Sequence, residues 1–206
     1  MPHVHTNDGT MFLEITANRE KRKGWIEVIT GSMFSGKTEE LLRRMRRAQF
    51  AKQKVEIFKP AVDTRYSDDK VVSHDANAIQ STVIDNAQQM LILANDVDVV
   101  GIDEAQFFTD EIIETCEQLA ESGVRVIVAG LDMDYKGKPF GPMPQLLARA
   151  EYVTKVHAIC VRCGSLAQFS HRTSAEEDTI ILGETDRYEP LCRKCYREAI
   201  QQKNKL

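Results

Sequence analysis

GSMFSGKT, residues 31–38, is the stretch of sequence that decides the fold, because it matches the pattern G-x-x-x-x-G-K-[ST] of a phosphate-binding loop. The apolar segment before it, WIEVIT at 25–30, has the composition of a short buried strand. The segment after it, EELLRRMRRAQFAKQK at 39–54, repeats apolar residues at helical spacing. Because the pattern requires a strand before the loop and a helix after it, this context favours nucleotide binding over a chance match in a structural turn.

The residues of this loop suit the phosphates of ATP or GTP. Its glycines let the backbone curl so that N–H groups point at phosphate oxygens, and the following helix adds the positive end of its dipole. We expect Lys37 to reach the β- and γ-phosphates and the Thr38 hydroxyl to ligate Mg²⁺.

Other apolar segments predict further strands of the same sheet. They are VEIFKP at 55–60, VDVVGID at 97–103 and VRVIVAGLD at 124–132, with a helix expected over 109–122. Strands built almost wholly from Val, Ile, Leu and Gly suit a parallel sheet that is buried on both faces. The sequence therefore predicts an α/β fold of the P-loop NTPase type, a parallel sheet flanked by helices.

The apolar strand expected over 97–103 ends with Asp103, and Glu104 follows it directly. A carboxylate at this place is what a P-loop enzyme supplies to Mg²⁺, and we assign that role to Asp103. Glu104 is then free to accept a proton, from a water in an ATPase or from a substrate hydroxyl in a kinase. The alternative is that these acids only cap the start of the next helix.

Four of the five cysteines form two C-x-x-C pairs, Cys160 with Cys163 and Cys192 with Cys195, separated by 28 residues. In a reducing compartment such pairs hold metal more readily than disulfides, and four sulfurs make a closed, structural Zn²⁺ site. Two disulfides or a redox iron site are the alternatives. Cys116 lies among apolar residues at helical spacing and is expected to be part of the core.

These features predict three parts of the chain: a flexible leader over 1–23, a P-loop α/β nucleotide-binding domain over 24–150, and a zinc-binding lasso subdomain over 151–206. Within the last, TIILG at 179–183 is expected to form a short strand. The polar, turn-rich segment 63–80 is a candidate mobile loop.

Composition limits the possible partners of this 206-residue chain. Its 27 Lys and Arg nearly balance 31 Asp and Glu, so overall charge does not favour a nucleic-acid partner. No apolar run approaches the roughly 20 residues of a membrane span, and we expect a soluble, cytoplasmic protein. Two functions are alternatives to a small-molecule kinase. One is an ATPase that contacts nucleic acid through the basic run at 43–47, and the other is a zinc-ribbon binding module. We interpret that basic run as the solvated or subunit-facing side of a helix.

A series of longer motifs resembles the type II, zinc-containing thymidine kinases. From about residue 24 to residue 196 the chain carries, in family order, GSMFSGKTEEL, KPAVDTRYS, DEAQFF, GLDMDYKGKPFGP, CVRCGSLAQFSHR and DRYEPLCRKCY. The resemblance implies transfer of the ATP γ-phosphoryl group to the 5′-hydroxyl of thymidine, which gives thymidine monophosphate and ADP in pyrimidine salvage. It also implies a homotetramer and feedback inhibition by dTTP.

The same resemblance assigns residues to the reaction. Glu104 matches the family's proton acceptor, and Arg65 and Arg172 are candidates to neutralise charge on the transferred group, although loop arginines are often merely solvated. The residues assigned to ATP are Gly31, Ser32, Met33, Phe34, Ser35, Gly36, Lys37, Thr38, Asp103, Glu104, Ala105 and Gln106. Those assigned to thymidine are Met33, Asp63, Phe107, Leu131, Tyr135, Ser170, Ile180, Ile181, Leu182, Gly183 and Tyr188. The zinc subdomain would anchor a lid that covers the base and excludes water.

Overall fold

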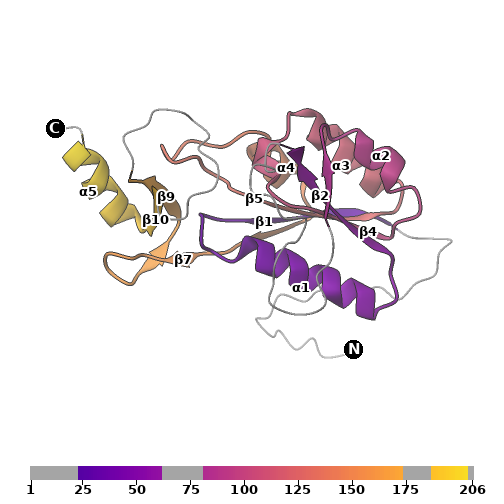
Figure 1. Cartoon of the computed structure of the whole chain (residues 1–206), viewed down its shortest axis with the longest axis horizontal. Helices are drawn as coiled ribbons and strands as arrows, with labels where there is room; N and C mark the ends of the chain where they lie inside the picture. Colours follow the sequence, from indigo (N-terminus) through magenta and orange to yellow (C-terminus); the bar gives the residue numbers. More distant parts are fainter. Residues whose placement is uncertain (1–22, 62–80, 174–186, 204–206) are drawn as a thin grey trace, which may run out of the picture.

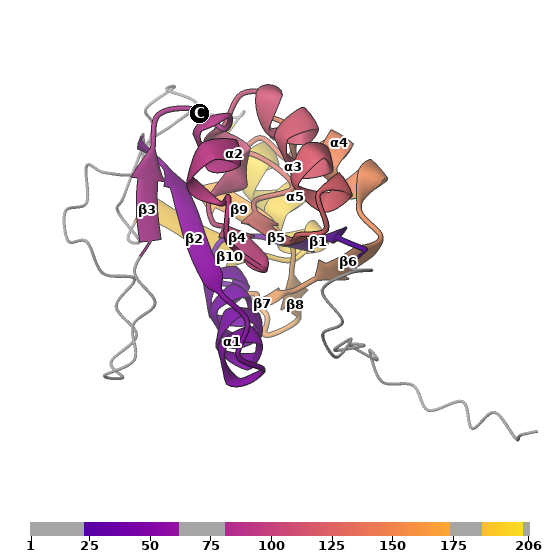
Figure 2. The same cartoon turned by 90° about the vertical axis from the view of Figure 1, so that its right-hand side faces the viewer.

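The structure is a computed structural model that describes residues 23–61, 81–173 and 187–203. Its centre is a six-stranded sheet in the order β3-β2-β4-β5-β1-β6, and each neighbouring pair of strands in this sheet is parallel. Helices lie on both faces of the sheet, and a smaller unit with its own short strands lies at one end (Figures 1 and 2). The α/β class with a parallel central sheet is therefore confirmed.

The strands at the middle of the sheet come from the apolar segments that predicted them. The six strands are β1 (Trp25–Thr30), β2 (Val55–Pro60), β3 (Ser81–Ile84), β4 (Val99–Ile102), β5 (Arg125–Gly130) and β6 (Tyr152–Lys155). Every residue of β4 and β5 is buried, as expected for strands covered on both faces. β4 and β5 are shorter than predicted, and they end before Asp103 and Asp132, respectively.

Two apolar cores fill the spaces between the sheet and its helices. On one face α1 (Lys37–Phe50) packs Leu41 and Met45 against Ile29 and Ile127. On the other face the core joins Val28 to α2 (Gln89–Leu93), α3 (Glu111–Glu121) and α4 (Met143–Arg149). Alternate residues of β1 point to opposite faces, which is why one short strand contributes to both cores.

Cys116 is fully buried in the core formed by α3, and burial raises the pKa of its thiol to about 12. The expectation of a core cysteine is therefore confirmed. Among the described residues no helix is long and apolar enough to cross a bilayer.

The C-terminal unit is built from short strands and one helix. The hairpin β7 (Ala158–Ile159) and β8 (Leu166–Ala167) and the antiparallel pair β9 (Phe169–Arg172) and β10 (Tyr188–Leu191) precede α5 (Arg193–Lys203). A third core joins these elements, in which the rings of Phe169 and Tyr196 stack with centroids 4.4 Å apart. The expected boundary at residue 150 falls just before β6, which pairs with β1 and is the last strand of the main sheet.

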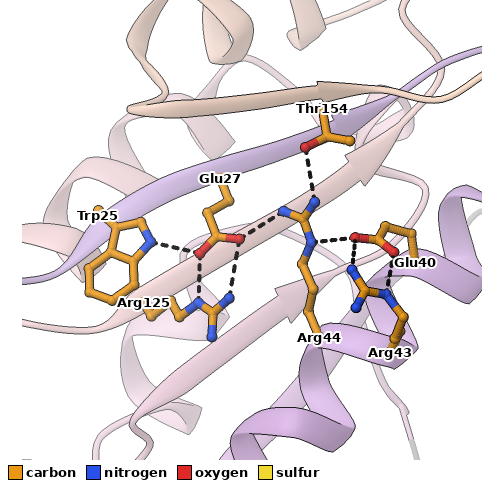
Figure 3. A network of polar contacts seen from close by, with 7 residues as sticks. All are labelled: Trp25, Glu27, Glu40, Arg43, Arg44, Arg125 and Thr154. Atoms are coloured by element: carbon orange, nitrogen blue, oxygen red, sulfur yellow. Dashed lines mark hydrogen bonds and ion pairs between the residues drawn. The ribbon is translucent and has the colours of Figure 1, made fainter. Parts of the chain in front are cut away.

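A network of buried charges joins α1 to the sheet (Figure 3). Glu27 of β1 accepts hydrogen bonds from Arg44 of α1 at 2.8 Å and from Arg125 of β5 at 2.6 Å. Arg44 also donates to Glu40 and to Thr154 of β6. Burial acts to raise the pKa of Glu27, but the hydrogen bonds and charges of its partners outweigh it and hold the pKa below its ordinary value.

The interpretation of the basic run 43–47 as a solvated or subunit-facing surface is wrong for one member. Arg44 is only 2% exposed, because its aliphatic stem follows the apolar face of α1 and its guanidinium meets Glu27. A residue held in this way is not available to the phosphates of a nucleic acid. This removes part of the basis for the nucleic-acid ATPase.

We predict that Glu27→Gln lowers the free energy of unfolding by about 3–5 kcal/mol, because it removes the buried carboxylate that pairs with both Arg44 and Arg125. Urea titration followed by circular dichroism measures this change. The control is Glu117→Gln, which removes a more exposed ion pair with Arg149 and is expected to cost less than about 1 kcal/mol. Equal effects of the two variants would contradict the importance given to the buried network.

Candidate active site

The phosphate loop connects β1 to α1, as the sequence predicted. Two of its glycines are required by their surroundings. A Cβ atom on Gly31, whose φ is +151°, would lie 2.2 Å from the backbone oxygen of Val156, and Gly36 enters α1 in the left-handed region with φ +81°. The loop conformation therefore depends on glycine at both positions.

Lys37 begins α1 and its side chain turns back into the loop. The Nζ atom donates a hydrogen bond to the backbone oxygen of Ser32 at 2.9 Å, and the residue is only 9% exposed. Burial lowers the pKa of Lys37, and the negative charges of Glu104, Asp103 and Asp132 act in the opposite direction. The buried ammonium group of Lys37 thus lies close enough to these carboxylates to feel their charge.

Thr38 and Asp103 lie within reach of each other. The Thr38 hydroxyl donates to Asp103 Oδ2 at 3.1 Å, and Asp103 is 3% exposed. Burial, followed by the charge of Glu104, raises the pKa of Asp103 to about 7. A cation at this place would favour the ionised carboxylate, so this oxygen pair fits a magnesium ion.

Glu104 lies beyond the end of β4 and has a left-handed backbone conformation, with φ +53°. This turn separates it from Asp103, whose Oδ1 accepts the Glu104 backbone N–H at 3.0 Å. Glu104 precedes the short 3₁₀ segment η3 (Ala105–Phe107), and no side-chain capping hydrogen bond forms there. The next helix, α3, starts after Asp110, also without one. These observations argue against the capping alternative.

The residue Asp132, which was not among the predicted site residues, also belongs to this edge of the sheet. It lies two residues after the end of β5, pairs with Lys155, and its charge acts on Lys37. Among the described residues neither Asp132 Oδ1 nor the buried Ser32 Oγ has a hydrogen-bond partner. A signal for Asp132 was present in the sequence, because the carboxyl ends of neighbouring parallel strands meet at one edge, and Asp103 and Asp132 both stand there.

A hydrogen bond links the phosphate loop to the C-terminal unit. The backbone N–H of Met33 donates to Ser170 Oγ of β9 at 3.0 Å. On the same strand, Arg172 lies with its guanidinium carbon 3.7 Å from the centroid of the Tyr135 ring and donates to the Tyr188 hydroxyl at 2.7 Å. Four residues predicted to contact thymidine or phosphate, Ser170, Arg172, Tyr135 and Tyr188, are thus brought together.

Arg172 is 2% exposed, so its charge is sheltered by the two tyrosines. Its role in neutralising the transferred group stays a prediction. Phe107 contacts Phe140 edge to face, and Leu131 lies just after β5. Asp63, Arg65, Ile180, Ile181, Leu182 and Gly183, the leader and the loop 63–80 lie outside the described residues.

The four paired cysteines converge on one point. Their sulfurs all lie within 4.8 Å of one another, and Cys163 Sγ is 3.6 Å from Cys192 Sγ. Sulfurs bound to one Zn²⁺ at about 2.3 Å in a tetrahedron are about 3.8 Å apart, so the cluster fits such an ion. A hydrogen bond from Ser165 lowers the pKa of Cys163 to about 6, whereas burial raises the pKa of Cys195 to about 12, so a metal ion would have to displace a proton from at least one of the four thiols. The four cysteines are free thiols, which argues against two disulfides.

Comparison with known proteins agrees with this site. The family model described as thymidine kinase matches residues 24–196. The thymidine kinase of Bacteroides thetaiotaomicron is 63% identical over 189 residues, which are 92% of this chain and 95% of that protein. That of Bacteroides fragilis is 62% identical over 192 residues, covering 93% and 96%. That of a Rhodothermus species is 62% identical over 174 residues, covering 84% and 82%. This chain therefore belongs to the thymidine kinase family.

Proposed function

We propose that this chain transfers the γ-phosphoryl group of ATP to the 5′-hydroxyl of thymidine, forming thymidine monophosphate and ADP. The observation that carries the proposal is the convergence of Lys37, Asp103 and Glu104 at one edge of the sheet. Phosphoryl transfer needs a cation beside the phosphates and an acceptor for the proton of the attacking alcohol. These residues supply both.

On the ATP side, the backbone of the loop at 31–38 and the Lys37 ammonium would hold the phosphates. The unpartnered Ser32 hydroxyl supports this placement, because a phosphate oxygen would satisfy a buried group that has no other partner among the described residues. Thr38 and Asp103 would hold Mg²⁺, which neutralises charge on the β- and γ-phosphates. Ala105 and Gln106, which the family resemblance also assigns to ATP, are both buried.

On the thymidine side, Met33, Phe107, Leu131 and Tyr135 would form the walls of the base pocket, with Asp63 and the segment 180–183 completing it. The bond between Met33 and Ser170 supports this, because it holds β9 and its partner strand against the phosphate loop. Tyr188 and Ser170 then lie on neighbouring strands and can present hydroxyls to the nucleoside. Glu104 would accept the proton of the 5′-hydroxyl as the oxygen attacks the γ-phosphorus.

We predict that Glu104→Gln lowers kcat by roughly 10²- to 10⁴-fold, because the amide keeps the size of the side chain and loses the proton acceptor. ADP release is measured with thymidine, deoxycytidine and single-stranded DNA in separate assays. Glu114→Gln, on the exposed face of α3, is the control and is expected to keep full activity. Unchanged kcat in a folded Glu104→Gln sample would contradict the mechanism, and stimulation by DNA alone would favour a nucleic-acid ATPase.

We also propose that the four-cysteine cluster holds one structural Zn²⁺ ion. The supporting observation is that the cysteines lie close in sequence to two strands. β10 ends at Leu191, directly before Cys192, and β9 begins only six residues after Cys163. The metal would therefore fix the two strands that carry Ser170, Arg172 and Tyr188. A site with four protein sulfurs leaves no open position for water, so the ion would not take part in the reaction.

We predict about one zinc per chain in metal analysis, and well below one in the variant Cys195→Ser. Loss of zinc is expected to reduce kcat/KM for thymidine by roughly 10-fold or more, because the strands of the base pocket lose their anchor. Cys116→Ala, which removes a cysteine outside the cluster, is the control and should keep its zinc. Iron in place of zinc, or disulfides found by mass spectrometry, would contradict the assignment.

The finer properties implied by the resemblance remain part of this proposal: a cytoplasmic homotetramer that is inhibited by dTTP. One feature supports an assembly. The edge strand β6 exposes half of the surface of Tyr152 and of Val153, and an edge strand can pair with a second copy.

A further inference from the structure

Gln106 has both ends of its side-chain amide engaged inside the protein. The residue belongs to η3 and is 2% exposed. Its Oε1 accepts the backbone N–H of Leu131 at 2.9 Å, and its Nε2 donates to Glu104 Oε2 at 2.5 Å. The amide therefore bridges the end of β5 and the carboxylate that would accept the proton.

The orientation of this amide is fixed by chemistry. A backbone N–H is only a donor, so the group facing Leu131 must be the oxygen of the amide. The NH₂ group must then face Glu104, and a flipped amide would lose both hydrogen bonds. The carboxylate of Glu104 accordingly meets a donor, which restrains the position of its Oε2 atom.

The main chain around Gln106 leaves its side chain little room to move. A Cβ atom on Gly130 would lie 2.9 Å from Gln106 Oε1, and one on Gly141 would lie 2.4 Å from the Gln106 backbone oxygen. Gly141 also has a left-handed conformation with φ +48°, which favours glycine. Glycine at both places thus allows the backbone to close around Gln106.

Glu104 needs such support, because a glutamate side chain has three rotatable bonds and several competing rotamers. Within the described part of the chain, the hydrogen bond from Gln106 is the one that the Glu104 carboxylate receives. It engages Oε2 and leaves Oε1 to meet a substrate hydroxyl. A base must lie within hydrogen-bond reach of its proton, so the placement of this carboxylate limits the rate.

From this geometry we propose that Gln106 is a positioning residue, which holds the Glu104 carboxylate in the orientation that accepts the 5′-hydroxyl proton. The inference rests on the proposed function and adds a residue that acts through Glu104. It differs from the role in ATP binding that the family resemblance implies for Gln106, because a buried amide that is used at both ends contributes to kcat rather than to the affinity for ATP.

The test is a double-mutant cycle with the full chain: the parent, Glu104→Gln, Gln106→Met and the double variant. Methionine keeps the length of the side chain and removes both hydrogen bonds. Gln106→Met is expected to lower kcat by roughly 10- to 100-fold, the effect of a misplaced reacting group, with KM for ATP changed less than about 3-fold. In the Glu104→Gln background the same substitution should change kcat less than about 3-fold, because there is no base left to position.

The outcomes separate the two proposals. If Glu104→Gln leaves kcat unchanged, the proposed mechanism fails, and the positioning role fails with it. If Glu104→Gln lowers kcat but Gln106→Met does not, or if the two effects multiply fully, the mechanism stands and the role of Gln106 is overturned. A rise in KM for ATP as the main effect of Gln106→Met would overturn it as well, in favour of direct contact with ATP.

Two further variants guard against a trivial loss of fold. Thr115→Val removes a hydroxyl of a buried residue that, within the described ranges, donates to the Glu111 backbone oxygen of its own helix, and should keep kcat within about 3-fold. Gln106→Glu keeps an acceptor for Leu131 N–H and replaces the donor to Glu104 by a second carboxylate, so kcat should fall at least as far as in Gln106→Met. If Gln106→Met shows no cooperative melting, Gln106→Glu replaces it in the double-mutant cycle. Full kcat in Gln106→Glu would overturn the proposal.

Discussion

The meeting of several parallel strands at one edge of the sheet is the constraint on which this molecule depends. β1, β4 and β5 are neighbours that run in the same direction, so Lys37, Asp103 and Asp132 all emerge at their carboxyl ends. The positive charge of Lys37 and the negative charges of the two aspartates stabilise one another at a site that is largely buried from solvent. Without the parallel order, the same side chains would be distributed over two ends of the sheet.

The local part of this arrangement could be predicted from the sequence. Strand β1, the loop and α1 follow from a contiguous pattern of residues, and β2, β4 and β5 from apolar runs bounded by polar residues. The four-cysteine cluster followed from spacing alone, because two C-x-x-C pairs restrict the geometry strongly. The family's longer motifs then suggested candidate residues for the thymidine side, which stay a prediction.

The features that were missed arise from contacts between distant segments. Strands β3 and β6 to β10 have at most four residues each, too few for a periodic pattern. Arg44 resembled a surface residue in the sequence, since nothing local indicates that Glu27 and Arg125 would surround its guanidinium. The bridge made by Gln106 likewise requires the register of β5 against β4, which one sequence does not reveal.

The contact between Met33 and Ser170 has a consequence for protein engineering. The Met33 backbone amide, in the loop proposed to bind one substrate, also donates a hydrogen bond to β9, a strand proposed to line the pocket of the other. A library that aims to change nucleoside preference should therefore restrict position 170 to serine or threonine. Tyr135 and Leu131 are better positions to randomise, because their side chains do not form the hydrogen bond between the phosphate loop and β9.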